Sequence, residues 1–395
     1  MRQKIRLILT NLLHIALNWI WGKKNKDYVP RTLLIIRLDE IGDYILFRNF
    51  LKVIRNSDRF RGYKMVLCGN EAWKDLAEEY DRDYVDEFVW LSKNVKRAIE
   101  FEIRLLKLAY KLRKMKFEVL INPVHSRTLW MDRLARYTGA NWKIASVGDC
   151  LNIDERTKRL TDKFYDELIP TLSQTEFEFY RNRKFIAGLI GKEDLPKLTE
   201  LEVRSCDRRE KRIVIAPGAN GNRKRWGGKN YGSICRRIMQ YFPSFEIAVV
   251  GSSKEVDIAE EVINHAGKGR VTNLVGKLSL PELVKVISSS ALLISNESSP
   301  AHIAAAVGTP FICISNGNNF GRFHPYPNNM VDYGAYIYPD SIEAVMKQPN
   351  GYGILSERYK GQKMENINSI SIDKVYCIVE NKVKDFLLKN LCYTS

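Results

Sequence analysis

One stretch near residue 300 groups side chains that could bind an anionic phosphate. Ser298 and Ser299 follow a short apolar run at residues 291–295 and precede Pro300. Serine is a preferred N-cap residue and proline is tolerated in a first helical turn, so Ser299 is predicted to be the N-cap of a short helix, residues 302–307, that ends before Gly308. Backbone N–H groups, two hydroxyls and the positive end of the helix dipole would meet there. This combination favours phosphate binding.

A basic loop at residues 217–226 is a second candidate for phosphate contact, since it also follows an apolar run, at residues 213–216. Gly218 in this loop would let the backbone approach a ligand closely, and consecutive basic side chains could neutralise a diphosphate leaving group. These basic residues are Arg223, Lys224 and Arg225. A solvated basic turn is the alternative. The spacing matches neither a P-loop nor a dinucleotide-binding fingerprint, so ATPase and dehydrogenase functions are disfavoured.

Asp43 is a candidate general base. It follows a predicted strand at residues 32–36 and lies at the start of an amphipathic helix predicted to extend to about Arg55. The helix dipole favours the ionised carboxylate there, which is the form that a base requires. The alternative is an ordinary capping residue.

Cationic residues that follow the first-half strands could hold an anionic acceptor. Arg37 follows the first strand, and others follow a strand predicted at residues 119–122. Arginine forks suit phosphate and carboxylate, although plain surface charge would give the same pattern. The candidates after that later strand are His125, Arg127, Arg133, Arg136 and Lys143.

Predicted strands and helices alternate along both halves of the chain, which is typical of an α/β fold with parallel sheets. Such sheets bind ligands at the carboxyl edge, where all of these candidates are expected. The remaining predicted strands are residues 64–68, 245–250, 271–276 and 311–315. The main helices expected between and after them are residues 93–116, 174–190, 231–241, 255–265, 281–288 and 372–391.

The length of 395 residues and the 45% hydrophobic content suit two domains with separate cores. The predicted domains are residues 30–190 and 211–365, joined by a polar linker at residues 191–210. A terminal helical segment, residues 366–395, follows the second domain.

The net charge of +17 indicates a polyanionic partner: nucleic acid, an anionic membrane surface or a phosphorylated substrate. Because the chain has no RNP-type aromatic platform, helix-turn-helix pattern or zinc spacing, nucleic acid is disfavoured. The seven cysteines are widely spaced, without a C-x-x-C pair. We therefore expect a reducing compartment and no zinc site.

The first 29 residues are predicted to form an amphipathic helix that lies on a membrane surface. Apolar residues recur at helical spacing, and Trp19 and Trp21 stand beside a lysine cluster, as in an interfacial anchor. The alternative is an ordinary helix packed on its own domain. The basic segment at residues 93–116 could face the same membrane or simply be a solvated face. The expected location is cytoplasmic, peripheral at the inner face of the plasma membrane.

Five motifs in order carry a resemblance to a known family: RLDEIGD, APGANGNRKRW, AVVGSSKE, NLVGKLSLPEL and SNESSPAHIAAAVGTP. Over residues 30–345 the chain resembles glycosyltransferase family 9, the ADP-heptose:lipopolysaccharide heptosyltransferases. The resemblance implies a GT-B fold, in which two Rossmann-like domains face each other across a cleft, and inverting sugar transfer from a nucleotide-sugar. It also implies that the C-terminal helix packs back on the first domain.

The resemblance also implies roles for individual residues. Asp43 would be the base, and Lys224, with Arg225 and Gly218 in the same loop, would contact the donor phosphate. The amides of Ser298 and Ser299 would hold the diphosphate. The remaining donor residues would be Gly251 and Ser253 at the nucleoside, Glu297 and His302. The family usually has Asp-Ser/Thr-Gly where this chain has Glu297-Ser298-Ser299, so the donor sugar and base stay open.

The implied ligands are a nucleotide-sugar, with ADP-heptose expected, and a lipopolysaccharide or other lipid-linked anionic glycan as acceptor. No D-x-D element is placed to bind an obligatory metal, although Glu297 could contact a divalent ion. Three alternatives stay open. They are a relative that binds a nucleotide-sugar without transferring it, another GT-B enzyme such as an epimerase, and a basic nucleic-acid-binding protein.

Overall fold

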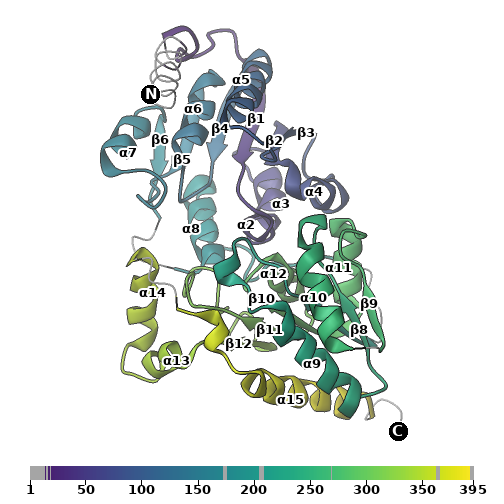
Figure 1. Cartoon of the computed structure of the whole chain (residues 1–395). Helices are drawn as coiled ribbons and strands as arrows, with labels where there is room; N and C mark the ends of the chain where they lie inside the picture. Colours follow the sequence, from purple (N-terminus) through teal and green to yellow (C-terminus); the bar gives the residue numbers. More distant parts are fainter. Residues whose placement is uncertain are drawn as a thin grey trace. The chain divides into compact units, whose positions relative to one another are not determined.

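The computed structural model describes residues 14, 17, 19–171, 176–203, 209–267, 269–361 and 365–391. The chain forms two compact α/β units (Figure 1). The first unit comprises residues 1–173 and 180–196, and the second comprises residues 174–179 and 197–395.

The first unit is built on a parallel six-stranded sheet with the order β3-β2-β1-β4-β5-β6. The apolar run Leu33 to Ile36 in β1 is fully buried, as expected of a central strand that helices cover on both faces. The strands are β1 Val29–Arg37, β2 Lys64–Asn70, β3 Glu87–Leu91, β4 Phe117–Asn122, β5 Trp142–Ser146 and β6 Glu167–Ile169. The helices are α2 Ile41–Ile45, α3 Asn49–Asn56, η1 Glu71–Trp73, α4 Lys74–Tyr80, α5 Ala98–Lys114, α6 Leu129–Tyr137, α7 Glu155–Asp162 and α8 Glu178–Ile190.

The second unit repeats this design, with the sheet order β12-β11-β10-β7-β8-β9. Its strands are β7 Glu210–Ala216, β8 Glu246–Val249, β9 Val271–Asn273, β10 Ser290–Asn296, β11 Phe311–Ile314 and β12 Gly334–Ile337. Its helices are η2 Asn222–Lys224, α9 Gly228–Tyr241, η3 Ser253–Glu255, α10 Val256–Ala266, α11 Leu280–Ser288, α12 Ser299–Ala306, α13 Asp340–Met346, α14 Gly351–Gly361, η4 Ile367–Ser369 and α15 Ile372–Leu391.

Both sheets have the doubly wound order in which the first and fourth strands are neighbours at the centre, and each sheet pairs them in parallel. The strand order reverses at that point, and ligands of such sheets bind beside the carboxyl ends of those two strands. In the first unit these ends lead into the loops that carry Asp43 and His125, and in the second they lead into residues 217–226 and 297–299. The predicted α/β fold class is confirmed, and the topology places the candidate loops at the expected edges.

The helix predicted to extend from Asp43 to about Arg55 is two helices, α2 and α3. The backbone N–H of Phe47 bonds to the carbonyl of Tyr44, and that of Phe50 bonds to the carbonyl of Phe47. These tighter i to i−3 bonds interrupt the α-helical pattern between the two segments.

The C-terminal helix α15 packs within the second unit, which differs from the prediction that it packs on the first domain. Val375, Val379 and Val383 recur at helical spacing and are buried in the hydrophobic core of the second unit. Arg237 of α9 also forms an ion pair with Asp373 at 2.6 Å. The apolar stripe of α15 therefore covers the second sheet.

The predicted linker at residues 191–210 also differs from the structure. Leu201 is buried, and its N–H donates to the carbonyl of Ala306, so this segment belongs partly to the second unit. Residues 176–179 belong there too, since Arg322 Nε donates to a carboxylate oxygen of Glu178 at 2.9 Å and both side chains are buried.

Among the described residues, no helix is both long and apolar enough to cross a membrane.

Candidate functional site

In the second unit, Asn296 connects the two candidate phosphate loops. Its Oδ1 accepts the backbone N–H of Trp226 at 3.1 Å, and its Nδ2 donates to the carbonyl of Pro217 at 2.6 Å. The side chain at the end of β10 therefore holds both ends of the basic loop. No local sequence pattern predicts this role for Asn296.

Helix α12 presents its N-terminal turn at the same edge. Its N-cap is Ser298, one residue earlier than predicted, and the helix ends as predicted before Gly308, which has φ of 73°. The Ser298 hydroxyl donates to the carbonyl of Asn296 at 3.4 Å and caps no amide of the helix. An anion can therefore satisfy the first-turn N–H groups in place of a side-chain cap.

Glu297 lies buried between β10 and α12. Its carboxylate accepts hydrogen bonds from the hydroxyl of Ser315 and the amide of Asn319. Burial raises the pKa of Glu297, and the positive charge of Lys224 acts in the opposite direction. Lys224 of η2 is thus close enough to influence Glu297, so the basic loop and the start of α12 share one electrostatic environment.

His302 is on α12 and is buried. Its Nδ1 lies 2.7 Å from the hydroxyl of Tyr326, and its ring stacks on that of His324 at a centroid distance of 4.7 Å. Burial lowers the pKa of His302 to about 3. The imidazole is therefore neutral in the ligand-free protein at neutral pH.

Gly218 and Gly251 lie against the carboxylate of Glu255. A Cβ atom at Gly218 would be 1.7 Å from Oε1 of Glu255, and one at Gly251 would be 2.9 Å from Oε2. Glu255 also accepts the N–H of Ser252 at 2.7 Å in a capping box. Glu255 was not predicted, although the spacing Ser252-x-x-Glu255 is the sequence signature of that box.

Two other predicted donor residues border these loops. Ser253 packs against Gly276, where a Cβ atom would lie 3.2 Å from the Cα of Ser253. Arg225 donates through Nε to the carbonyl of Ala219 at 3.1 Å, so its guanidinium supports the basic loop from within.

In the first unit, Asp43 lies in the first turn of α2, as predicted. Its carbonyl oxygen accepts a hydrogen bond from Arg37 at 3.2 Å. Arg37 is fully buried, where it also forms an ion pair with Asp39 at 3.0 Å and donates to Asn182 at 3.1 Å. This differs from the acceptor role predicted for Arg37, because its fork is directed to protein groups that hold the Asp43 loop.

His125 and Arg127 follow β4 at the carboxyl edge, and both are buried. The Nδ1 of His125 lies 2.8 Å from the hydroxyl of Thr171, and its Nε2 lies 3.6 Å from a carboxylate oxygen of Asp149. His125 therefore belongs to a polar network at this edge.

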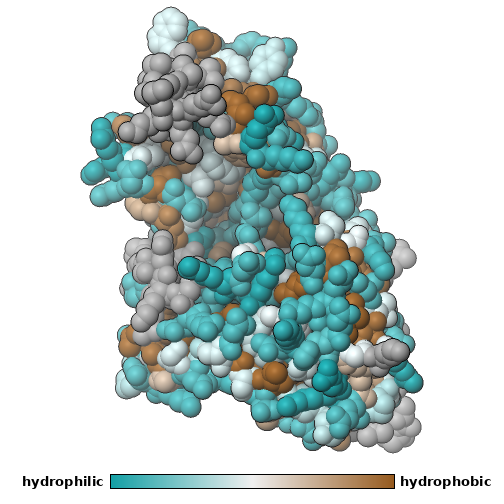
Figure 2. Space-filling view, in the orientation of Figure 1, coloured by the Kyte–Doolittle hydropathy of each residue, from teal (hydrophilic) through white to brown (hydrophobic). Residues whose placement is uncertain are grey.

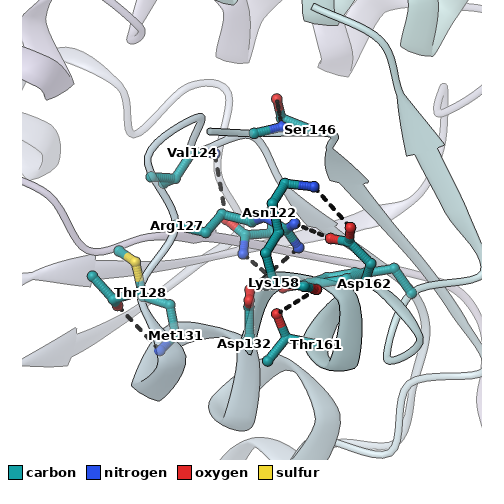
Figure 3. Close-up of polar contacts among 12 residues, drawn as sticks. Asn122, Val124, Arg127, Thr128, Met131, Asp132, Ser146, Lys158, Thr161 and Asp162 are labelled. Atoms are coloured by element: carbon teal, nitrogen blue, oxygen red, sulfur yellow. Dashed lines mark hydrogen bonds and ion pairs between the residues drawn. The ribbon is translucent and has the colours of Figure 1, made fainter. Parts of the chain in front are cut away.

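Arg127 is the centre of a buried charge cluster, which Figure 3 shows. Its guanidinium bonds to Asp162, lies 3.5 Å from Asp132 and donates to the carbonyl of Val147 at 3.3 Å. Lys158 donates to the second oxygen of Asp162 at 2.7 Å. Because protein carboxylates already balance its charge, the structure gives Arg127 a stabilising role that the sequence analysis did not predict.

Arg133 and Lys143 are not grouped with His125. The charge of Glu102, on α5, acts on Arg133, and burial lowers the pKa of Arg133. Lys143 is near the start of β5, hence at the amino edge of the sheet, and donates to the carbonyl of Ala140 at 2.8 Å. Chain order alone does not separate the two edges of a sheet.

Most of the helix predicted at residues 1–29 lies outside the described residues. Its described end packs on the first unit through His14, which is buried, with Nδ1 3.1 Å from the Tyr137 hydroxyl and Nε2 3.3 Å from Glu102. Trp21 stacks on Tyr110 at a centroid distance of 6.2 Å. His14 thus gives the predicted helix a buried contact with the first unit.

Three exposed aromatic side chains near this end of the helix each have a lysine ammonium group over the ring. Lys23 lies over Trp19 at 5.8 Å, Lys24 over Trp142 at 5.7 Å and Lys114 over Tyr110 at 4.6 Å. Trp19 is 79% exposed. Figure 2 shows hydrophobic side chains at the surface in the region where Figure 1 draws α5. We call these six residues the aromatic–lysine patch.

Within the described ranges, no group of three or more His, Cys, Asp or Glu side chains is arranged to hold a metal ion.

Two units, each built on a doubly wound sheet of parallel strands, define a protein of the GT-B class, and solved structures agree. A family 9 glycosyl transferase from Veillonella parvula has a TM-score of 0.67 at 16% identity, with 90% of this chain and 97% of that chain covered. The Escherichia coli heptosyltransferase WaaC, solved with ADP-2-deoxy-2-fluoro heptose, has a TM-score of 0.63 at 14% identity, covering 89% and 99%. At these identities the likeness concerns the fold.

Residues 171–352 match the model of glycosyltransferase family 9 (heptosyltransferase). The match confirms the predicted resemblance, over a shorter range than residues 30–345.

Curated relatives cover the chain in part. Lipopolysaccharide heptosyltransferase 3 of Escherichia coli is 30% identical over 128 residues, which are 32% of this chain and 37% of that protein. Lipopolysaccharide core heptosyltransferase OpsX of Haemophilus influenzae is 27% identical over 154 residues, 39% and 44%. The chain thus spans less than half the length of each of these relatives.

Proposed function

We propose that the protein is an inverting glycosyltransferase that moves a sugar, with ADP-heptose as the expected donor, to a lipopolysaccharide or another lipid-linked glycan. The observation that carries this proposal is the group of Lys224, Glu297, Ser298 and His302 beside the carboxyl ends of β7 and β10. This group lies inside the segment that matches family 9. The family match and the ligand-binding edge of the sheet thus coincide in one unit.

The second unit would bind the donor. The uncapped first turn of α12 and the hydroxyls of Ser298 and Ser299 suit the diphosphate. Lys224 would neutralise the charge that grows on the leaving group, and His302 would add a hydrogen bond. Gly218, Gly251 and Ser253 border the loops where the nucleoside would lie.

The first unit would supply the base. The acceptor oxygen forms a bond to the anomeric carbon as the bond from that carbon to the diphosphate oxygen breaks, which inverts the configuration. Asp43 would take the proton of the acceptor hydroxyl, and the nucleoside diphosphate would leave with the electron pair. Lys224 and the α12 amides offer the positive charge for this step, so we assign no obligatory metal.

The acceptor would be reached at the cytoplasmic face of a membrane. The aromatic–lysine patch supports this part of the proposal, since amphipathic rings and lysines are typical of the interface with anionic lipids. Attraction of about 1 kcal/mol per lysine near the surface would add to burial of the exposed rings.

A panel of nucleotides tests the donor assignment. We expect ADP and ADP-heptose to raise the thermal unfolding temperature of the full chain more than the UDP and GDP counterparts do. Protection by another base would replace ADP in the proposal, and protection by none would contradict it.

Transfer is then tested with a lipid-linked glycan acceptor. Release of ADP together with a glycosylated product of inverted configuration is expected. Binding without release would indicate the alternative of a protein that only holds a nucleotide-sugar, and a new free nucleotide-sugar would indicate an epimerase.

A further inference from the structure

The hydrogen bond between Tyr326 and His302 bears on the tautomer of His302 as well as on the position of its ring. The Tyr326 hydroxyl lies 2.7 Å from Nδ1 of His302, and both side chains are buried. A neutral imidazole carries its proton on only one nitrogen, and the hydrogen bond made by the other nitrogen sets which one. The direction of this bond therefore determines what His302 can offer to a ligand.

The hydroxyl must be the donor in this bond. Burial raises the pKa of Tyr326 well above its ordinary value and lowers that of His302, so both groups are neutral at neutral pH. In the part of the chain that the structure describes, the Tyr326 hydroxyl has no hydrogen-bond partner other than Nδ1 of His302. If Nδ1 carried the proton, the buried hydroxyl hydrogen would have no acceptor, which is unfavourable.

The ring of His302 is also held in its plane. His324 stacks on it with an interplanar angle of 23°, and His324 is completely buried. Tyr326 packs in turn against Phe177 at a centroid distance of 4.7 Å. The orientation of the imidazole is thus defined by packing on one face and by the Tyr326 hydroxyl at one edge.

We propose that Tyr326 is a positioning residue that locks His302 in the tautomer protonated on Nε2, so that His302 donates a hydrogen bond to the donor phosphate. The phosphate part rests on the proposed function. The tautomer part concerns the ligand-free protein alone. His302 would then supply a directed N–H, while the positive charge comes from Lys224 and the α12 amides.

Nuclear magnetic resonance of the ¹⁵N-labelled full chain tests the tautomer directly. The chain has five histidines, and a His302→Gln variant identifies the signals of His302. We expect a protonated Nε2 and an unprotonated Nδ1 in the wild type, and a mixture of tautomers in Tyr326→Phe. Protonation of Nδ1 in the wild type, or an unchanged His302 pattern in the variant, would overturn the proposal.

Tyr333→Phe is the matched control. The Tyr333 hydroxyl donates at 2.6 Å to the carbonyl of Ala305, on the same helix as His302, but contacts no imidazole. This variant removes a hydroxyl bonded to α12 and should leave the His302 signals unchanged. If it shifts the tautomer as Tyr326→Phe does, the effect belongs to helix packing and the proposal fails.

ADP binding separates this inference from the proposed function. The apparent dissociation constant for a ligand that needs one tautomer is the intrinsic constant divided by the fraction of that tautomer, so Tyr326→Phe should weaken ADP binding by about twofold or more. Tyr333→Phe should bind as the wild type does. If ADP binds none of these proteins, the proposed donor fails, and the wild-type spectrum still decides the tautomer.

Discussion

The guanidinium of Arg37 donates a hydrogen bond to the carbonyl oxygen of Asp43 at 3.2 Å. Arg37 ends β1 and Asp43 lies in α2, so the contact closes the loop between the strand and the helix. The same guanidinium packs over the ring of Phe47 at 4.3 Å. The position of the proposed base is therefore fixed by a buried cation.

Asp43→Asn should lower sugar transfer by about 10² or more, which is the usual size of a general-base contribution. Donor binding should persist, because the candidate donor residues are in the second unit. Transfer rate and ADP affinity are measured together. Glu40→Gln, which changes the neighbouring exposed carboxylate, is the control and should keep its activity. Transfer by the Asn variant at the wild-type rate would remove Asp43 from the mechanism.

Arg37→Lys should reduce transfer about tenfold or more while leaving ADP affinity unchanged. Lysine keeps the charge but cannot bond to Asp39, Asn182 and the Asp43 carbonyl in the geometry of a guanidinium fork. A small displacement of a catalytic group is costly even when the group itself is intact. If Arg37 instead bound the acceptor, the Michaelis constant for the acceptor would rise with little change in kcat.

Arg127→Met should destabilise the protein by about 3 to 5 kcal/mol, since it leaves Asp132 buried without its cation. Urea unfolding measures the change. Arg156→Met, at an exposed position of α7, should stay within about 0.5 kcal/mol of the wild type. If Arg127→Met lost affinity for the acceptor but kept the stability of the wild type, the predicted role of Arg127 in acceptor binding would be supported instead.

The stability effect of Glu297→Gln should depend on pH. Burial raises the pKa of Glu297 above its ordinary value of 4.5, so above pH 4.5 the folded state binds more protons than the unfolded state. The contribution of this carboxyl to stability therefore falls as the pH rises from 4.5 towards the raised pKa of Glu297. Relative to the wild type, the Gln variant should become progressively more stable from pH 4.5 upward in thermal unfolding.

Glu282→Gln provides a control of opposite sign. Hydrogen bonds from the Ser279 backbone and hydroxyl lower the pKa of Glu282 below 4.5. The contribution of Glu282 to folding stability is present above pH 4.5 and is lost as the pH falls through its lowered pKa. This variant should therefore lose stability relative to the wild type as pH rises. Equal trends in both variants would contradict the burial argument.

Replacing Lys23, Lys24 and Lys114 with glutamate should reduce the affinity for anionic vesicles by a factor of about 10² or more, at roughly 1 kcal/mol per lysine. Sedimentation with the vesicles measures this affinity. Neutral vesicles should show little difference. The control replaces three exposed lysines of the second unit, Lys211, Lys347 and Lys389, and so makes the same change in net charge. Equal losses in both variants would assign the attraction to overall charge.

The local parts of the fold could be predicted from the sequence. Helix α15 has its predicted body, and the Ser371 hydroxyl accepts the N–H of Lys374 as an N-cap does. The long buried runs in β1 and β10 were also predicted. Strands β3, β5, β6 and β12 were missed because each has only three to five residues, and runs this short do not distinguish a strand from other structure.

The candidate site was predictable only where its contacts are local. Ser298 and His302 belong to one short motif, whereas Asn296 and Tyr326 act on partners 70 and 24 residues away. The role of Arg127 is hard to predict for a related reason. The sequence does not show whether a basic residue faces solvent or a buried carboxylate. Only the fold brings Asp162 into contact with Arg127.

The salt bridge between Glu178 and Arg322 determines how the chain can be divided. A fragment that starts after the predicted linker, at residue 211, would leave Arg322 buried without its carboxylate, and it would lack the bond from Leu201 to Ala306. A fragment that ends at residue 190 would carry Glu178 away from its own unit. The two units are thus interleaved along the chain, and a split protein would regain an intact second unit only if residues 176–179 were supplied in trans.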